Sequence, residues 1–237
     1  MRVFVTHSPE DLDAYYANAL VELRDVADVV LNPLDRDLAT PELIDACEGC
    51  DVVVAHRSTP GEVALFQARP ELVAFLRCAV DISTIDVDAA SDAGVLVARA
   101  DTSYVASTAE LALGLYLATA RHIATSTAEY RQGIEPAQRQ GRQLAGKVAG
   151  VIGHGAIGSY LARLLTSLGL TVLVHDPHVD AGSIAHEVVS LPELLRRSDV
   201  VFPLAPGNLP ETTGMIDADA LAAMPAGSTL INVSRGE

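Results

Sequence analysis

Six consecutive residues, Gly153-His154-Gly155-Ala156-Ile157-Gly158, have the types and spacing that suit a pyrophosphate. In a G-x-G-x-x-G turn the first glycine allows a tight bend, the second lets the backbone approach the phosphates, and the third lets a helix pack closely on a strand. About 20 residues beyond the turn lies Asp176, whose carboxylate can accept hydrogen bonds from both hydroxyls of an adenosine ribose. The spacing predicts a dinucleotide site, and the acid favours NAD over NADP because a 2′-phosphate would meet a carboxylate.

Two apolar runs and an amphipathic segment are placed to position these residues. The run 148–152 leads into the glycine turn, residues 156–168 have helical periodicity, and the run 171–175 ends at Asp176. This order of strand, turn, helix, strand and acid is what a dinucleotide site requires. The start of the helix would offer unpaired amide hydrogens and a positive dipole end to the phosphates.

Short apolar runs alternate with helical periodicity along the first hundred residues, which predicts a parallel sheet with helices on both faces. After them we expect one long apolar helix over 105–120, and then a polar connecting stretch over 125–144 that contains Gly133, Pro136 and Gly141. The strands expected in the first part are 2–6, 27–31, 51–56, 72–77 and 95–98, and its helices are 11–23, 41–48, 61–67 and 87–93.

A second alternating unit begins at Val148. A doubly wound dinucleotide fold has about six strands, whereas the pattern gives only four here, so we expect this domain to be incomplete at its carboxyl end. The strands expected are 148–152, 171–175, 199–202 and 229–233, with helices at 156–168, 191–197 and 218–224.

Composition limits the classes of function. The 237 residues are 49% hydrophobic and carry a formal net charge of −15, which disfavours nucleic acid and offers no basic strip for a membrane surface. The longest apolar run, 111–120, is too short to cross a bilayer. Of the three cysteines, Cys47 and Cys50 form a C-x-x-C without a second pair, so we expect free thiols, a cytoplasmic location and no metal site.

Six motifs are spread along most of the chain. They are I-D-V-x-A-A-S-x-x-G at 85–94, S-T-A-E-L at 107–111, L-A-G-K-V-A-G-V-I-G-H-G-A-I-G at 144–158, S-L-P-E-L-L-R-R-S-D-V-V at 190–201, P-E-T-T-G-M-I at 210–216 and I-N-V-S-R-G at 231–236. Through these motifs the chain resembles the D-isomer-specific 2-hydroxyacid dehydrogenases. The resemblance implies an α/β fold of two doubly wound parallel-sheet domains, namely a flavodoxin-like substrate domain and an incomplete Rossmann NAD-binding domain. We expect the first over 1–101, an interdomain helix and connecting segment over 102–145, and the NAD-binding domain over 146–237.

The resemblance also implies the catalytic chemistry. Arg235 matches the family's arginine, whose guanidinium would hold the substrate carboxylate and polarise the reacting carbonyl. The family's histidine exchanges a proton with the substrate oxygen during hydride transfer, and a glutamate orients that histidine. Both lie in later motifs that these residues do not include, so the chain alone is expected to be inactive. None of its seven histidines is assigned to catalysis.

The substrate loop departs from the family. Members commonly carry R-x-G-x-G-x-D-N, whose glycine amides hold the substrate carboxylate, whereas residues 77–84 read R-C-A-V-D-I-S-T. Ala79, Val80 and Asp81 are thus expected at the substrate, together with His56 and Arg57 beyond the third strand. Asp81 would repel an anionic substrate. Either its side chain turns away, to solvent or to cap Ser83, or the substrate is not an ordinary 2-oxoacid.

By the same resemblance, further residues are expected to contact NAD, and the protein is expected to be a homodimer. The function expected is hydride transfer between NAD(H) and a small 2-hydroxy or 2-oxo acid; the alternative is a catalytically silent, NAD-sensing binding or corepressor-like protein. The further cofactor residues are Thr108, Pro177, Leu204, Ala205, Pro206, Thr212, Val233 and Ser234.

Overall fold

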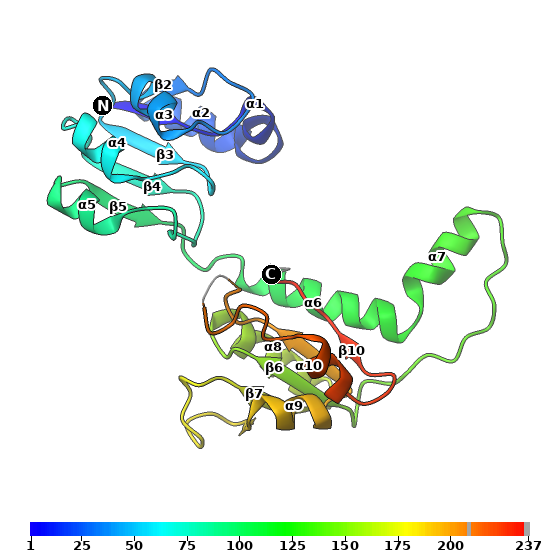
Figure 1. Ribbon diagram of the computed structural model, residues 1–237. Helices are drawn as coiled ribbons and strands as arrows, with labels where there is room; N and C mark the ends of the chain where they lie inside the picture. Colours follow the sequence, from blue (N-terminus) through cyan, green and yellow to red (C-terminus); the bar gives the residue numbers. More distant parts are fainter. Residues whose placement is uncertain (208–209, 235–237) are drawn as a thin grey trace. The chain divides into compact units, whose positions relative to one another are not determined.

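A computed structural model describes residues 1–207 and 210–234 of the chain (Figure 1). The chain divides into two compact units, Met1–Thr102 and Ser103–Glu237. Each unit is an α/β layered structure with its own parallel sheet and its own core.

The first unit is built on a five-stranded parallel sheet in the order β2-β1-β3-β4-β5. Its central strands are short runs of valine, phenylalanine and leucine that are buried on both faces, as parallel strands between helical layers must be. The order is that of flavodoxin-like folds, which bind ligands at the carboxyl edge of the sheet. The strands are β1 Arg2–Val5, β2 Asp28–Leu31, β3 Val52–Ala55, β4 Ala74–Arg77 and β5 Leu96–Arg99.

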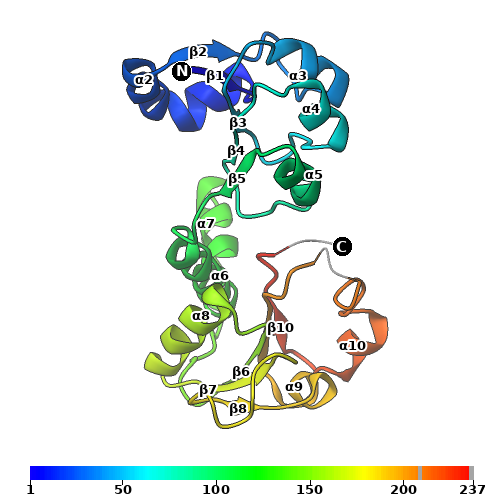
Figure 2. The same cartoon turned by 90° about the vertical axis from the view of Figure 1, so that its left-hand side faces the viewer.

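Helices cover both faces of this sheet (Figure 2). On one face, α3 Thr40–Ala46, α4 Val63–Ala68 and α5 Val87–Asp92 enclose the larger core, which includes Phe66 and Phe75. On the other face lie α1 Pro9–Asp11, the π-helical turn η1 Leu12–Tyr16 and α2 Ala17–Val26.

The second unit has a five-stranded parallel sheet in the order β10-β9-β6-β7-β8. Counted from β6, this is the strand order of a Rossmann dinucleotide fold, whose ligand crevice lies where the order reverses, between β6 and β9. The strands are β6 Val148–Ile152, β7 Thr171–His175, β8 Glu187–Val188, β9 Val200–Pro203 and β10 Thr229–Leu230.

In this unit α6 Val105–Ala120 and α8 Ala156–Ser167 lie side by side on one face, and α9 Leu191–Arg197 and α10 Ala218–Ala223 cover the other (Figure 2). Ala109, Ala112 and Tyr116 of α6 belong to the same core as Leu161 and Leu165 of α8. The remaining helix is α7 Ile123–Arg131. The two parallel sheets confirm the predicted α/β fold class.

Three expectations need correction. The second sheet has a fifth strand, β8, which pairs with β7 through two residues and is too short to leave a periodic pattern. The stretch expected to be a connection starts with α7, because its glycines and proline come only after residue 131. The last strand ends at Leu230 rather than at Val233.

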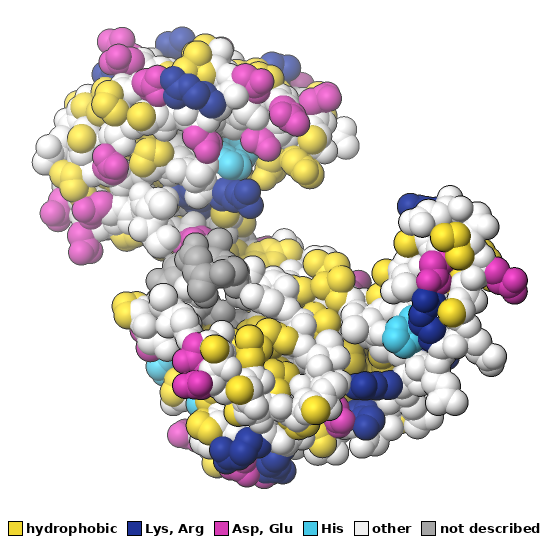
Figure 3. Space-filling view, turned by 45° about the vertical axis from the view of Figure 1, so that its right-hand side comes forward, with side chains coloured by type: hydrophobic (Ala, Val, Ile, Leu, Met, Phe, Trp, Pro, Cys, Tyr) yellow, Lys and Arg dark blue, Asp and Glu magenta, His cyan; other side chains and the backbone are white. Residues whose placement is uncertain are grey.

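Acidic side chains are interspersed with lysine and arginine side chains over the face drawn in Figure 3. No helix among residues 1–207 and 210–234 combines the length and the apolar character needed to span a bilayer.

Candidate functional site

The glycine turn closes tightly between β6 and α8. Gly153 has φ +91°, in the left-handed region that side chains rarely adopt, and a Cβ there would lie 2.7 Å from the backbone nitrogen of Ala205. At Gly158 a Cβ would lie 2.0 Å from the carbonyl oxygen of Gly153. These two glycines are therefore required by close packing within the protein.

Gly155 is different, because a Cβ on it would meet no atom of the described residues within 4 Å. It has extended backbone geometry and precedes the first residue of α8, and no side chain caps the helix there. The first turn of α8 thus presents open amides and the positive end of the helix dipole above a glycine with free space beside it. This is the environment that a pyrophosphate needs.

Asp176 lies next to the turn, immediately after β7. Its carboxylate accepts hydrogen bonds from the backbone nitrogen of His154 at 2.7 Å and from that of His178 at 2.9 Å. Burial acts to raise the pKa of Asp176, but the two backbone hydrogen bonds, aided by the imidazoles of His178 and His154, outweigh it and lower the pKa. The acid is therefore a carboxylate held against the glycine turn.

The loop after β9 completes the crevice. The backbone nitrogen of Leu204 donates to the carbonyl of Ile152 at 2.8 Å, which continues the pairing of β9 with β6. The hydroxyl of Thr212 donates to the carbonyl of Pro206, and the hydroxyl of Ser234 donates to that of Ala205 at 3.1 Å. The structure thus brings together the predicted residues of three separate segments.

A cavity of about 230 Å³ lies beside this loop. Predicted residues Ala205, Thr212 and Ser234 line it, together with Asn232, whose side-chain oxygen accepts from the nitrogen of Ser234 at 2.9 Å. Asn232 is not among the residues predicted from the sequence, although the I-N-V-S-R-G motif contains it.

Three further predicted cofactor residues differ in their burial. Val233 packs against the core of the second unit, and Thr108 lies half-buried in the first turn of α6. Pro177 is exposed between Asp176 and His178. The predicted catalytic residue, Arg235, lies outside the described residues.

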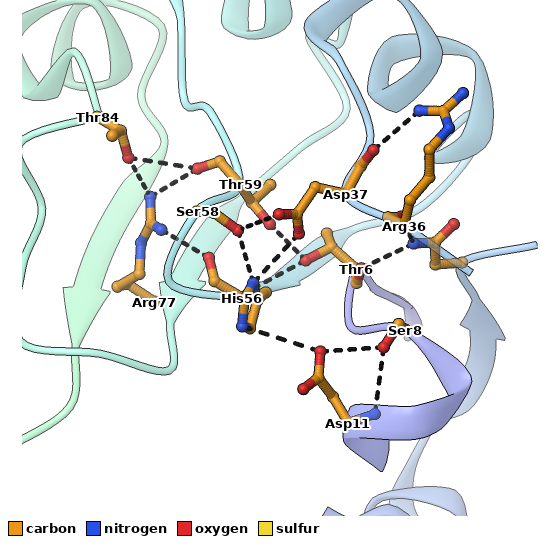
Figure 4. A network of polar contacts seen from close by, with 11 residues as sticks. Thr6, Ser8, Asp11, Arg36, Asp37, His56, Ser58, Thr59, Arg77 and Thr84 are labelled. Carbon is orange, nitrogen blue, oxygen red and sulfur yellow. Dashed lines mark hydrogen bonds and ion pairs between the residues drawn. The ribbon is translucent and has the colours of Figure 1, made fainter. Parts of the chain in front are cut away.

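In the first unit the substrate loop starts at a buried arginine (Figure 4). Arg77 is 2% exposed and donates to the carbonyls of His56, at 2.6 Å, and Thr59, at 2.7 Å, and to the hydroxyl of Thr84 at 2.8 Å. Its guanidinium therefore ties the substrate loop to the loop after β3. Burial lowers the pKa of Arg77, partly offset by the carboxylate of Asp81.

Asp81 accepts a hydrogen bond from the backbone nitrogen of Ser83 at 2.9 Å. This is the capping arrangement that the sequence left open for this residue. The neighbouring carbonyl of Val80 accepts from Arg99 at 3.1 Å, and Ala79 accepts from the nitrogen of Ala100 at 3.2 Å. The backbone of the loop is thus fixed to the end of β5 and the residue that follows it.

His56 joins the loops at the same edge of the sheet (Figure 4). Its Nδ1 lies 2.7 Å from the hydroxyl of Ser58 and 3.2 Å from the carboxylate of Asp37, and its Nε2 lies 3.9 Å from the carboxylate of Asp11. Arg57, the next residue, is exposed. The residues expected at the substrate thus share the carboxyl edge of one sheet.

The two cysteines of the C-x-x-C pair belong to the larger core of the first unit. Cys47 and Cys50 are buried free thiols, and burial raises the pKa of Cys47 to about 11. Within the part of the chain that the structure describes, no group of three or more histidine, cysteine, aspartate or glutamate side chains is placed to hold a metal ion.

Comparisons with known proteins agree with this geometry. Residues 113–237 match the family model described as D-isomer specific 2-hydroxyacid dehydrogenase, NAD binding domain. The D-3-phosphoglycerate dehydrogenase of Mycobacterium bovis is 35% identical over 206 residues, which are 85% of this chain and 38% of that protein. The hydroxypyruvate reductase of Thermotoga maritima is 30% identical over 238 residues, covering 100% of this chain and 76% of the relative.

Solved structures show the same fold. A protein from Thermus thermophilus superposes with a TM-score of 0.85 at 28% identity, over 100% of this chain and 74% of that one. D-lactate dehydrogenase from Escherichia coli gives a TM-score of 0.81 at 25% identity, over 100% of this chain and 75% of that one. The matched residues span 38% of the length of the mycobacterial phosphoglycerate dehydrogenases and 43% of that from Methanocaldococcus jannaschii.

The matched model covers the glycine turn, Asp176 and the loop after β9, so the prediction of NAD as cofactor is confirmed. The residues themselves fit it, because Gly155 leaves space at uncapped amides and Asp176 is ionised beside them. The chain belongs to the D-isomer-specific 2-hydroxyacid dehydrogenase family.

Proposed function

We propose that the protein is an NAD-dependent oxidoreductase that transfers hydride between NAD(H) and a small 2-hydroxy or 2-oxo acid. The observation that carries the proposal is the open amide end of α8 at Gly155, with the carboxylate of Asp176 held beside it. The family membership supports the same reaction class.

The second unit binds the cofactor in this proposal. The amides at the start of α8 hold the pyrophosphate, and Asp176 accepts hydrogen bonds from the adenosine ribose. The cavity lined by Ala205, Thr212 and Ser234 receives the nicotinamide half. Bound NAD supplies the hydride acceptor, and the protein's task is to fix its position.

The first unit contributes the substrate contacts. The substrate faces the backbone of Ala79 and Val80 and the side chains of His56 and Arg57. Asp81 keeps its hydrogen bond from the backbone nitrogen of Ser83. Arg235 holds the substrate carboxylate, as a bidentate guanidinium can. We assign residues 1–101 to substrate binding, 102–145 to the interdomain helix and connection, and 146–237 to NAD binding.

The same proposal includes an oligomeric state and a cellular location. The protein works as a homodimer, as family resemblance implies. Three free cysteines fit a cytoplasmic location, because thiols stay reduced there.

A second candidate is a binding protein that senses NAD without turning over a substrate. The substrate loop favours it, because Asp81 stands where the family commonly has glycine and both terminal nitrogens of Arg77 donate within the protein, to His56, Thr59 and Thr84. Such a protein would keep the cofactor site and lose the reaction.

The two candidates are separated by NADH oxidation assays of the complete gene product with glyoxylate, pyruvate and hydroxypyruvate. The loss of nicotinamide absorbance is followed at about millimolar substrate. Turnover with any of them, abolished in Arg235→Ala, supports the dehydrogenase. Saturable NADH binding with no turnover on a panel that also includes phosphorylated and cationic 2-oxo acids would instead support the sensor. Loss of NADH binding itself would contradict both.

A further inference from the structure

A separate cavity of about 300 Å³ lies in the second unit, at the amino edge of its sheet. Lys147, Asp199 and Thr229 line it, and they stand just before or at the first residues of β6, β9 and β10. Gly153 and Leu204 of the proposed cofactor site follow the opposite, carboxyl ends of β6 and β9. The cavity is therefore distinct from that site.

The side chains around this cavity carry a positive charge, although the whole chain has a net charge of −15. Arg142 and Lys147 line it, and Asp199 is the one carboxylate among the described residues of the lining. Asp199 accepts hydrogen bonds from Nζ of Lys147 at 3.1 Å and from the backbone nitrogen of Val148 at 2.9 Å. Two cations and one carboxylate leave one uncompensated positive charge.

Arg142, the second cation, is held in place by neutral groups. Its guanidinium donates to the carbonyl of Gly227, and its backbone nitrogen donates to the carbonyl of Ala120 at 2.8 Å. Gly227 has φ +79°, and a Cβ on it would lie 3.0 Å from the guanidinium, so a glycine suits this close approach. The two carbonyls fix Arg142 without neutralising its charge.

The turn between α6 and α7 brings His122 to the same cavity. Among the described residues, His122 is the one non-glycine residue with a positive φ, at 57°. Side chains adopt this backbone region at a cost in free energy, and residues held in it concentrate at ligand sites. The strained turn therefore points to a ligand in this cavity.

Tyr116 of α6 adds a hydroxyl to the lining. Its ring lies edge-on to that of Phe202 in the core, with 5.9 Å between ring centroids. Burial, followed by the carboxylate of Asp199, raises the pKa of Tyr116, so the phenol keeps its proton and can donate it in a hydrogen bond.

We propose that this cavity binds a compact oxyanion, namely the phosphate or carboxylate group of a small metabolite. The fork-shaped guanidinium of Arg142 suits either group, and Lys147 has three N–H donors, of which Asp199 uses one. The cavity volume is at the lower end of the range for small-molecule sites, which limits the size of the ligand. The proposal is independent of the reaction proposed above.

The experiment is calorimetric titration of the full chain with inorganic phosphate and with malonate, at an ionic strength kept constant with KCl. Saturable binding of either anion supports the proposal, and the tighter one identifies a phosphate or a carboxylate as the group recognised. Each titration is repeated with saturating NADH. This repeat separates the cavity from the amides at the glycine turn, which could also hold phosphate.

Two variants act on the cavity, and each has a matched control. Thr119→Glu places a carboxylate in the lining at an exposed position of α6, where glutamate is a good helix former, and Thr127→Glu adds the same charge to α7 outside the lining. Arg142→Gln removes the uncompensated cation, and Arg131→Gln removes an exposed one from the end of α7. Circular dichroism verifies folding, and Thr119→Glu decides alone if Arg142→Gln does not fold.

The wild type and both controls should bind one anion per chain, with or without NADH, and Thr119→Glu and Arg142→Gln should weaken binding about tenfold or more. The proposal is overturned if the wild type binds neither anion saturably, or if Thr119→Glu binds as tightly as Thr127→Glu. Displacement of the anion by NADH would also overturn it. A chain that binds the anion but not NADH would contradict the cofactor assignment and support the cavity.

Discussion

The backbone nitrogen of His154 donates to the carboxylate of Asp176 at 2.7 Å, although 22 residues separate them in the chain. This bond joins the glycine turn after β6 to the end of β7. It holds the acid proposed to bind the adenosine ribose beside the amides proposed to bind the pyrophosphate. Preorganisation of this kind reduces the cost of ordering a site on binding.

Asp176→Ala should weaken NAD binding by about 10- to 100-fold. The variant would lose the two hydrogen bonds that the ribose hydroxyls are proposed to donate to the carboxylate. NADP binding should weaken much less, since the carboxylate repels its 2′-phosphate in the wild type. Fluorescence titration with NADH and NADPH at about pH 8 measures both. Equal losses for the two cofactors would contradict the role given to Asp176.

Two glycines of the turn should respond differently to alanine. Gly158→Ala should lower the free energy of unfolding by about 1–3 kcal/mol, because its Cβ would overlap the carbonyl of Gly153 at 2.0 Å. Gly155→Ala should leave the stability nearly unchanged, since its Cβ would meet no atom within 4 Å. It should weaken NADH binding, because we propose that the pyrophosphate occupies this open space. Urea unfolding and NADH titration of both variants test the pair. A destabilised Gly155→Ala that binds NADH normally would contradict the assignment.

Much of this site could be predicted from the sequence because it depends on local spacing. The turn at Gly153, the limits of β6 and α9, and the position of Asp176 follow from periodicity and from glycine chemistry. The 2.7 Å bond from His154 to Asp176 could not, because it depends on how two strands pair. The strand β8 is equally hidden, since its two residues are ordered only by pairing with β7.

Tertiary packing also decides features of the first unit that its sequence does not reveal. His7 follows β1 in a polar segment, T-H-S-P, yet only 2% of its surface is exposed and neither ring nitrogen has a hydrogen-bond partner among the described residues. Its ring lies edge-on to those of Tyr16 and His56. Segments far apart in the chain create this burial, so no local sequence pattern predicts that His7 is buried.

The burial of His7 predicts acid sensitivity. Burial first, and then the imidazole of His56, lowers the pKa of His7 from 6.5 to about 4, so the unfolded chain binds a proton at a higher pH than the folded one. Its contribution to stability is complete above pH 6.5 and is lost as the pH falls towards 4, on the order of 3 kcal/mol.

Urea unfolding of His7→Phe across this range should show a shallower loss of stability than the wild type. The exposed residue His178 provides the control, because His178→Gln removes an imidazole without disturbing a core. Parallel pH profiles for the wild type and His7→Phe would show that the buried imidazole has no such role.

The net charge of −15 predicts that salt stabilises the fold. Salt screens the repulsion among the 31 acidic residues. Exposed ion pairs such as Arg36 with Glu42 contribute little to the stability of the fold, so screening them costs little. The melting temperature should therefore rise as KCl increases to about 1 M, where the screening length is about 3 Å. A melting temperature that falls steadily with KCl would show that ion pairs outweigh the repulsion.

The most direct test of the NAD site is titration of the folded chain with NADH, followed by the fluorescence of the nicotinamide, with circular dichroism to verify folding. We expect saturable binding of one NADH per chain, competed by NAD. A folded protein that shows no saturable NADH binding would contradict it.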